Sequence, residues 1–149
     1  CSMDWLASES AKAKTDWTLA MGHHPLISGG KYAKKRFHLE WTLADAVCAM
    51  QPDFYFSGHD HNFQHTMATI GSWRPCFMNH FTVGTGGAPL VNVAPIPEKS
   101  RFVRKTHGAG LIQINQEKMR FEFFEADTGD RLYLYEKNRE QESGEPRGH

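Results

Sequence analysis

The sequence lacks long apolar runs, an excess of either charge and any paired-cysteine motif. No apolar stretch approaches the roughly 18 residues that a membrane-spanning helix needs, so no membrane span is predicted. Lysine and arginine number 17 together, as do aspartate and glutamate, and no basic stripe stands out, which argues against nucleic acid as the main partner. The three cysteines show no Cys-x-x-Cys spacing, and one of them must stay unpaired within the chain.

The start of the sequence gives no targeting information. The chain opens with Cys1 rather than methionine and has no basic segment followed by an apolar one, so no signal peptide is predicted. We expect the sequence to be entered partway, as a fragment or a processed chain, and its compartment does not follow from these residues. A length of 149 residues suits about one domain or part of one.

Helical and strand patterns alternate over the first 60 residues. Apolar residues near one helical face predict a helix over about residues 2–14, and a short strand follows at 17–21. Residues 37–50 form a second amphipathic pattern. The aromatic run in 51–58 predicts a strand that is buried on both faces, as in a parallel sheet. This order predicts an α/β fold with neighbouring parallel strands.

The second half of the chain has a different pattern, with apolar and polar residues alternating between short turns. This pattern predicts an antiparallel sheet or meander. The predicted strands are residues 64–70, 76–84, 110–115, 118–126 and 131–136. We expect a proline-containing loop at 91–105. The last segment, 136–149, lacks large apolar residues, and we expect it to be disordered, which leaves residues 1–135 for the domain.

A pair of histidines follows the aromatic strand. His59 and His61 are two residues apart, so on an extended backbone their side chains would point the same way, about 7 Å apart. Asp60 and Asn62 are turn-forming residues that could orient the rings through hydrogen bonds. The strand at 17–21 also ends in a histidine motif, Gly-His-His-Pro, and parallel pairing would bring His23 close to His59.

Three neutral imidazoles suit zinc, iron, copper or nickel better than calcium. Taken alone, three such ligands resemble a mononuclear catalytic zinc site with one open position. The alternative is a polar loop whose histidines are held by hydrogen bonds and bind no ion.

The order of these motifs resembles a known family. The motif GHHP, then GHDHN 36 residues later, the glycine-rich VGTGGAP and the closing strands resemble the C-terminal half of calcineurin-like metallophosphoesterases. The branch that they resemble is the purple acid phosphatases of the small, tartrate-resistant type. The resemblance covers about residues 4–134. It implies an α/β metallophosphatase β-sandwich flanked by helices, with residues 1–135 as the C-terminal portion of that domain.

The resemblance also implies roles for the histidines and two metal ions. His23 and His59 resemble ligands of a divalent ion, and His61 resembles a ligand of the second ion, which is ferric in purple acid phosphatases. The implied cofactors are iron paired with iron, zinc or manganese, with Asp60 and Asn62 supporting the ligands. His24 would face the mouth of the site, either as a catalytic residue that touches substrate or as a solvent-facing loop histidine.

The sequence departs from the family pattern in two respects. The small acid phosphatases have a substrate-contacting histidine about nine residues beyond the first ligand, where this chain has Lys31 and Tyr32. These two residues are therefore candidates for contacting phosphate, and the leaving-group acid is not assigned. Ahead of the histidine motifs, none of the family's N-terminal motifs, Asp-x-His, Gly-Asp-x-x-(Asp/Tyr) and Gly-Asn-His-(Asp/Glu), occurs in this chain. The missing N-terminal half is therefore an expected partner, which would supply the bridging aspartate and the asparagine ligand.

The implied function is metal-dependent hydrolysis of phosphoric monoesters of small substrates. We expect this chain alone to be inactive, because it carries histidine ligands without the bridging carboxylate. Two alternatives stay open: a phosphodiesterase or nucleotide hydrolase of the same superfamily, and a non-catalytic binding module that retains the fold. A secretory or lysosomal location is favoured by the resemblance only.

Overall fold

The fold consists of two β-sheets and a helix. A computed structural model describes residues 5–6, 8–9, 16–31 and 37–139, with side chains from 43 onward in the last range. One sheet contains five strands in the order β1-β2-β4-β3-β5, and the other contains β6-β7-β8. The elements are β1 (Leu19–Gly22), α2 (Phe37–Ala49), β2 (Phe54–Ser57), β3 (Phe63–Ile70), β4 (Cys76–Val83), β5 (Ser100–Arg104), β6 (Gly108–Ile114), β7 (Lys118–Glu125) and β8 (Arg131–Asn138).

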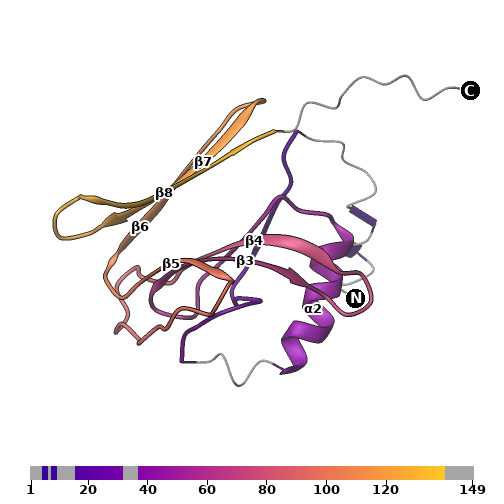
Figure 1. Cartoon of the computed structure of the whole chain (residues 1–149), viewed down its shortest axis with the longest axis horizontal. Coiled ribbons are helices and arrows are strands. Elements are labelled where there is room, and N and C mark those ends of the chain that lie inside the picture. Colours follow the sequence, from indigo (N-terminus) through magenta and orange to yellow (C-terminus); the bar gives the residue numbers. More distant parts are fainter. Residues whose placement is uncertain (1–4, 7, 10–15, 32–36, 140–149) are drawn as a thin grey trace, which may run out of the picture.

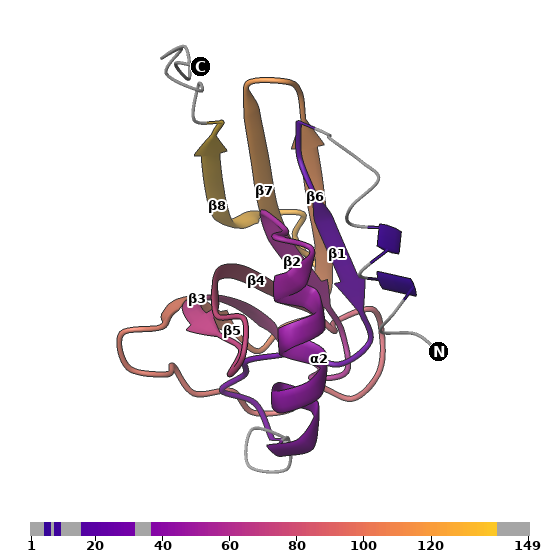
Figure 2. The ribbon, with the colours of Figure 1, turned by 90° about the vertical axis from the view of Figure 1, so that its right-hand side faces the viewer.

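The two sheets and the helix form three layers (Figure 1). Helix α2 packs on one face of the five-stranded sheet, and the β6–β8 sheet covers the other face, as the turned view also shows (Figure 2). Strand β1 pairs in parallel with β2, and β2 pairs in parallel with β4. Strands β3, β4 and β5 are antiparallel neighbours. This arrangement confirms the α/β class, the parallel pairing of the first two strands and the antiparallel second half.

Strand β2 is buried on both faces because its alternate side chains enter two different cores. Tyr55 packs toward α2, together with Ala44 and Val47. Phe54 and Phe56 point the other way, into the aromatic core between the sheets. This double burial explains why the segment has an almost continuous apolar run rather than an alternating pattern.

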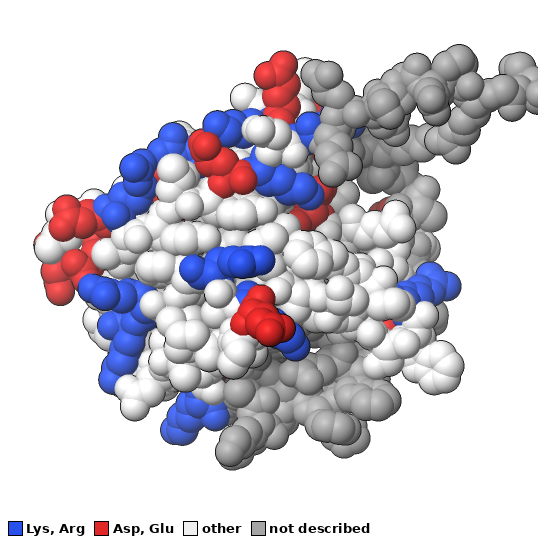
Figure 3. Space-filling model, viewed as in Figure 1, with Lys and Arg blue, Asp and Glu red and all other residues white. Residues whose placement is uncertain are grey.

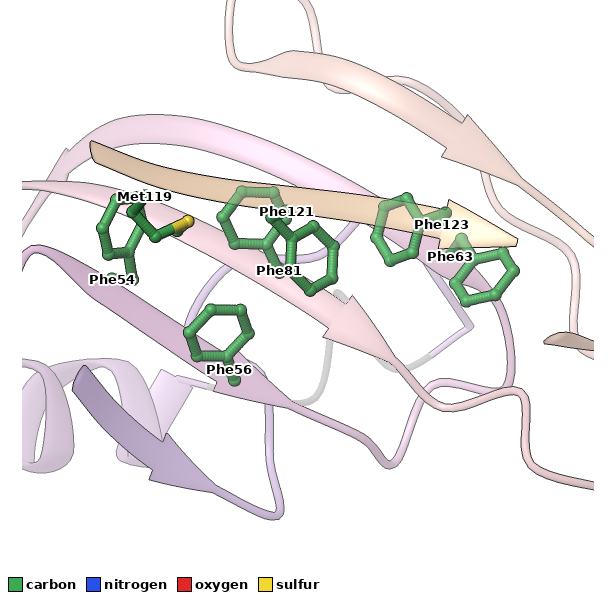
Figure 4. Packing of buried hydrophobic residues seen from close by; sticks show 7 residues of the cluster. All are labelled: Phe54, Phe56, Phe63, Phe81, Met119, Phe121 and Phe123. Carbon is green, nitrogen blue, oxygen red and sulfur yellow. The ribbon is translucent and has the colours of Figure 1, made fainter. Parts of the chain in front are cut away.

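Aromatic rings fill most of the core between the sheets (Figure 4). Phe81 of β4 stacks on Phe56 with ring centroids 5.4 Å apart, and it lies 4.2 Å from Phe121 of β7. Phe63 of β3 lies 4.3 Å from Phe123 of the opposite sheet. Burying each such ring stabilises the fold by about 1.5–3 kcal/mol. The β6–β8 sheet is therefore fastened to the five-stranded sheet mainly by apolar contact.

Three expectations need correction or extension. Strand β5 lies within the segment 91–105, where a loop is expected; among the described strands it is an edge strand that pairs only with β3. Its exposed arginines and the prolines before it masked the strand pattern. Of the helix expected at 2–14, residues 5, 6, 8 and 9 are described and helical, and the rest lies outside the described residues. Strand β8 extends to Asn138, past the boundary expected at 135, and residues 140–149 lie outside the described residues.

Charged side chains of both signs are interspersed on the face shown in Figure 3. Among the described residues, no helix is long and apolar enough to cross a membrane.

Strand β1 lies at one edge of its sheet, with β2 as its neighbour, and Met21 on this edge is 72% exposed.

A disulfide and a carboxylate attach the β3–β4 hairpin to α2. Cys48 near the end of α2 is bonded to Cys76 at the start of β4. Asp45, one turn earlier in the helix, accepts hydrogen bonds from the backbone N–H groups of Ser72, Trp73 and Arg74, at 2.7, 3.0 and 3.1 Å. Burial acts to raise the pKa of Asp45, but these three donors outweigh it and lower the pKa below its usual value.

We expect reduction of the Cys48–Cys76 disulfide to destabilise the chain. The bond joins residues 28 apart in sequence, and the loss of that constraint on the unfolded chain corresponds to about 3–4 kcal/mol. Urea unfolding with and without a reductant measures this difference. A Cys48→Ala/Cys76→Ala variant serves as the control and should no longer respond to the reductant. Equal midpoints for the oxidised and reduced wild-type chain would contradict the prediction.

A buried histidine lies in the core between the sheets. His65 of β3 is 0% exposed, and its ring stacks on Phe81 at 4.1 Å. Its Nδ1 lies 2.8 Å from the hydroxyl of Tyr133, and its Nε2 lies 3.4 Å from Oδ1 of Asn79. Burial lowers the pKa of His65 to about 4.

The buried His65 should make the fold acid-sensitive. The unfolded chain takes up a proton at this residue near pH 6.5, whereas the folded chain does so only near pH 4. The free energy of unfolding should therefore fall as the pH drops from 6.5 to 4, by about 3 kcal/mol in total. Urea unfolding at several pH values tests this. His65→Gln should remove most of the dependence, and a His107→Gln control should retain it; an unchanged slope in His65→Gln would assign the effect elsewhere.

Candidate metal centre

The two histidine loops meet because β1 and β2 are parallel neighbours. Gly22 at the end of β1 is in register with Ser57 at the end of β2, so both chains leave the sheet at the same edge. The two loops are in contact directly beyond the strands, since the N–H of Gly58 donates to the carbonyl of His23 at 3.1 Å. The carboxyl edge of parallel strands is where sites form in open α/β sheets.

Glycine is required at position 22 because a tyrosine ring lies against it. A Cβ at Gly22 would lie 2.1 Å from the hydroxyl of Tyr55. That hydroxyl donates a hydrogen bond of 2.8 Å to the carbonyl of His24. Tyr55 therefore holds the backbone of the first histidine loop from within the helix-side core, and the same burial raises the pKa of Tyr55 to about 12.

The second loop turns sharply at His59. This residue has a φ of +59°, a left-handed conformation that costs a residue other than glycine of the order of 1–3 kcal/mol. The N–H of Asp60 donates to the carbonyl of Gly58 at 2.7 Å. The backbone is therefore not extended at His59, and the expected separation of His59 and His61 along one side of a strand does not apply.

Three imidazoles gather where the loops meet. Nε2 of His23 lies 3.2 Å from Nδ1 of His59. The His24 ring lies 4.9 Å from that of His23 and 4.2 Å from that of His59. One nitrogen from each ring can be chosen so that all three lie within 4.8 Å of one another. In the described part of the chain, these three residues form the one group of three or more histidine, cysteine, aspartate or glutamate side chains whose ligand atoms come this close.

His61 points to a different part of the site. Its Nδ1 lies 2.8 Å from the carbonyl oxygen of Pro89, at the end of the glycine-rich segment 83–89. Because a carbonyl only accepts, Nδ1 carries the proton, and in the neutral ring Nε2 keeps its lone pair. A hydrogen bond of this kind orients many metal-binding histidines. His61 does not join the group formed by His23, His24 and His59.

A network of buried polar side chains joins the two loops; we refer to Ser28, Asp60, Asn62 and Gln64 together as the polar clamp. Ser28 donates to Asp60. The amide nitrogen of Gln64 donates to Ser28 at 2.8 Å and to Asn62 at 2.7 Å. Asp60 and Asn62 are both 0% exposed. The polar clamp fixes the segment after His24 against the loop that carries His59 and His61.

The sequence indicated Asp60 and Asn62 but missed Ser28 and Gln64. Gln64 lies in the strand predicted at 64–70, but its side chain is 1% exposed and its Oε1 accepts from the N–H of Gly29 at 2.8 Å. No local pattern marks Ser28, since its role depends on contact with a segment more than 30 residues away. Of the two candidates for contacting phosphate, Lys31 is exposed, and Tyr32 lies outside the described residues.

The chain is similar to several known proteins. Residues 2–63 match the family model described as calcineurin-like phosphoesterase. The chain is 24% identical over 113 residues to purple acid phosphatase 3 of Arabidopsis thaliana, covering 73% of this chain and 29% of the relative. It is 33% identical over 63 residues to tartrate-resistant acid phosphatase type 5 of Rattus norvegicus, covering 42% of this chain and 19% of the relative. The chain thus spans less than a third of the length of these curated relatives.

Two solved structures show the same fold. The purple acid phosphatase PPD1 from yellow lupin (Lupinus luteus) has a TM-score of 0.76 and 19% identity, covering 91% of this chain and 28% of that chain. GAP50, described as the anchor in the inner membrane complex of Plasmodium, has a TM-score of 0.69 and 21% identity, covering 94% and 42%. The resemblance stated from the sequence is confirmed: the chain is similar to calcineurin-like phosphoesterases. Within them, its similarity is to the purple acid phosphatases.

The donor set fits a transition-metal ion. In tetrahedral coordination with metal–nitrogen bonds of 2.0–2.1 Å, two ligand nitrogens lie about 3.3 Å apart. The nitrogens of His23 and His59 lie 3.2 Å apart. Neutral imidazoles favour zinc, iron, copper or nickel over calcium and magnesium.

Loss of the Ser28 hydroxyl should destabilise the fold. Ser28→Ala removes the donor to Asp60 and the acceptor for Gln64 and leaves buried polar groups unsatisfied, at a cost of about 1–3 kcal/mol each. Urea unfolding gives the change in free energy. Ser72→Ala, at an exposed position, is the matched control and should change the free energy by less than about 0.5 kcal/mol. Equal effects of the two substitutions would show that the polar clamp does not stabilise the loops.

Proposed function

We propose that this chain supplies histidine ligands to a metal-dependent phosphatase that hydrolyses phosphoric monoesters of small substrates. One observation carries the proposal: ring nitrogens of His23 and His59 lie 3.2 Å apart at the ends of two parallel strands. They do so in a chain that matches the calcineurin-like phosphoesterase model over residues 2–63. A phosphatase-like function is supported by the relatives, which are acid phosphatases.

We assign the residues of this chain to two ions, iron paired with iron, zinc or manganese. His23 and His59 would hold one ion and His61 the other, using the Nε2 that its bond to Pro89 leaves as an acceptor. Bound ions would hold the phosphate and supply a hydroxide nucleophile near neutral pH. The bridging carboxylate and the remaining ligands are expected from outside this chain, because the motifs that would supply them do not occur ahead of the histidine motifs in this sequence.

The geometry of the ligands in this proposal depends on the chain's own contacts. The polar clamp joins the two loops, and Tyr55 holds the carbonyl of His24. Asp60 and Asn62 therefore act through the loops, and we expect Asp60→Asn to reduce activity less than loss of any ligand histidine. Lys31 and Tyr32 are the proposed phosphate contacts. His24 has two possible roles, contact with the substrate or binding of an ion.

A secretory or lysosomal location is part of the proposal. The Cys48–Cys76 disulfide supports it, because disulfides persist in oxidising compartments and are rare in the cytosol.

A non-catalytic module is the second candidate. Its support is the fold shared with GAP50, which is described as an anchor. Metal binding and turnover distinguish the two candidates, since a module of this kind requires neither.

The test is made in the full-length protein that carries this chain. Hydrolysis of p-nitrophenyl phosphate should depend on metal and exceed that of bis-p-nitrophenyl phosphate. His23→Ala and His59→Ala should each lower kcat/KM by more than about 100-fold, since even changes to residues behind a ligand cost 10–100-fold. Both should lose the same ion, whereas His61→Ala should deplete the other one.

Metal analysis of the purified variants and a His107→Gln control complete the design. The control should keep its metal content and its turnover. Faster turnover of the diester would favour a phosphodiesterase. Absence of any turnover in a metal-loaded protein would favour the non-catalytic module. Loss of the same ion in His59→Ala and His61→Ala would replace the two-ion assignment with a single site.

A further inference from the structure

His24 has a position that the family pattern does not account for. The resemblance assigns ligand roles to His23, His59 and His61, yet the ring that lies beside His23 and His59 is that of His24. Its centroid lies 4.2 Å from the His59 ring, closer than the 5.1 Å between the rings of His23 and His59. A nitrogen of His24 also lies within 4.8 Å of the nitrogens that the other two rings offer.

Only small movements would close these three nitrogens around one ion. His23 and His59 already have the separation of two ligands of a tetrahedral ion. The nitrogen of His24 would have to approach each of the other two nitrogens by at most about 1.5 Å to reach a ligand separation near 3.3 Å. His24 is partly exposed and His23 is exposed, so side-chain rotation can provide this movement without repacking the core.

The backbone keeps the three rings together while their side chains adjust. The carbonyl of His24 accepts from Tyr55, and the carbonyl of His23 accepts from the N–H of Gly58. The left-handed turn at His59 directs the second loop toward the first. In these contacts the histidines contribute only main-chain atoms. Replacing a single histidine side chain therefore leaves the contacts in place.

We propose that His24 is a third imidazole ligand, with His23 and His59, of one transition-metal ion of the zinc class. The group contains no carboxylate, which favours borderline cations over calcium or magnesium. These three ligands leave at least one coordination position, which water, phosphate or the carboxylate expected from outside this chain can occupy. In this arrangement His24 belongs to the ion and is not the group that protonates the leaving oxygen. The inference deepens the proposed function by extending the donor set of one ion, and it rests on that ion binding at this edge of the sheet.

The 149-residue chain and cobalt(II) provide a test that does not depend on turnover. Visible absorption of cobalt(II) reports its coordination, and competition against a chelating dye gives the affinity for zinc. The wild-type chain should bind one equivalent of cobalt(II) with a four-coordinate spectrum. His24→Ala and His24→Gln should lower the affinity at least about tenfold, the smallest effect seen for residues that only support a ligand. Circular dichroism checks that each variant is folded.

Two further variants separate the outcomes. His107 lies outside the group of three imidazoles, and its Nδ1 donates to the carbonyl of Thr85. The His107→Gln variant should bind cobalt(II) like the wild type. His61→Gln should leave the first equivalent nearly unchanged. If His24→Ala binds cobalt(II) as tightly as the wild type, or if His61→Gln weakens the first equivalent while His24→Ala does not, the proposal is wrong.

The proposal and the proposed function can fail separately. A wild-type chain that shows no saturable cobalt(II) spectrum would overturn the three-imidazole site, whereas the phosphatase is tested in the full-length protein with its other ligands. If the full-length His24→Ala protein keeps its metal content but loses turnover, His24 contacts the substrate instead of the ion. That result would leave the phosphatase assignment standing.

Discussion

The parallel pairing of β1 with β2 is the constraint on which the site depends. Residues 22 and 57 are in register, so the two chains leave the sheet side by side and their next residues are histidines. Segments separated by 36 residues in the sequence thereby place imidazole nitrogens at the distance of two ligands of one ion. The pairing in turn depends on β2 being buried on both faces, between α2 and the aromatic core. The apolar interior therefore determines where the polar site forms.

The site is built from groups that are unfavourable on their own. His59 adopts a left-handed backbone conformation, and the carboxyl group of Asp60 is buried. Each costs free energy that hydrogen bonds must offset, and the polar clamp supplies several of these bonds within a few ångströms. The close approach of the segment after β4 to this loop adds another constraint, since a Cβ at Gly84 would lie 2.1 Å from the carbonyl oxygen of Asp60. A left-handed backbone and buried polar groups thus occur together in the loop that carries His59.

Much of the fold could be predicted from the sequence because its signals are local. The aromatic run of β2 and the alternating pattern of β7 indicate which faces of these strands are buried. The parallel pairing of β1 with β2 follows from the order of the elements. Strand β5 was missed because its exposed arginines and the prolines before it mask the strand pattern. Ser28 and Gln64 were missed for another reason, since their roles exist only where two distant segments meet. The position of His24 beside His59 depends on the left-handed turn, which no pattern in the sequence marks.

The disulfide between Cys48 and Cys76 has a topological consequence for the site. Residues 48–76 form a covalent ring, and this ring contains His59, His61 and three of the four residues of the polar clamp. The first histidine loop, with His23, His24 and Ser28, lies outside it. A protease that cuts once within the ring opens the second loop but releases neither piece, because the sulfur bridge still joins them. The nicked chain would gain only the mass of one water under oxidising conditions and separate into two pieces only after reduction.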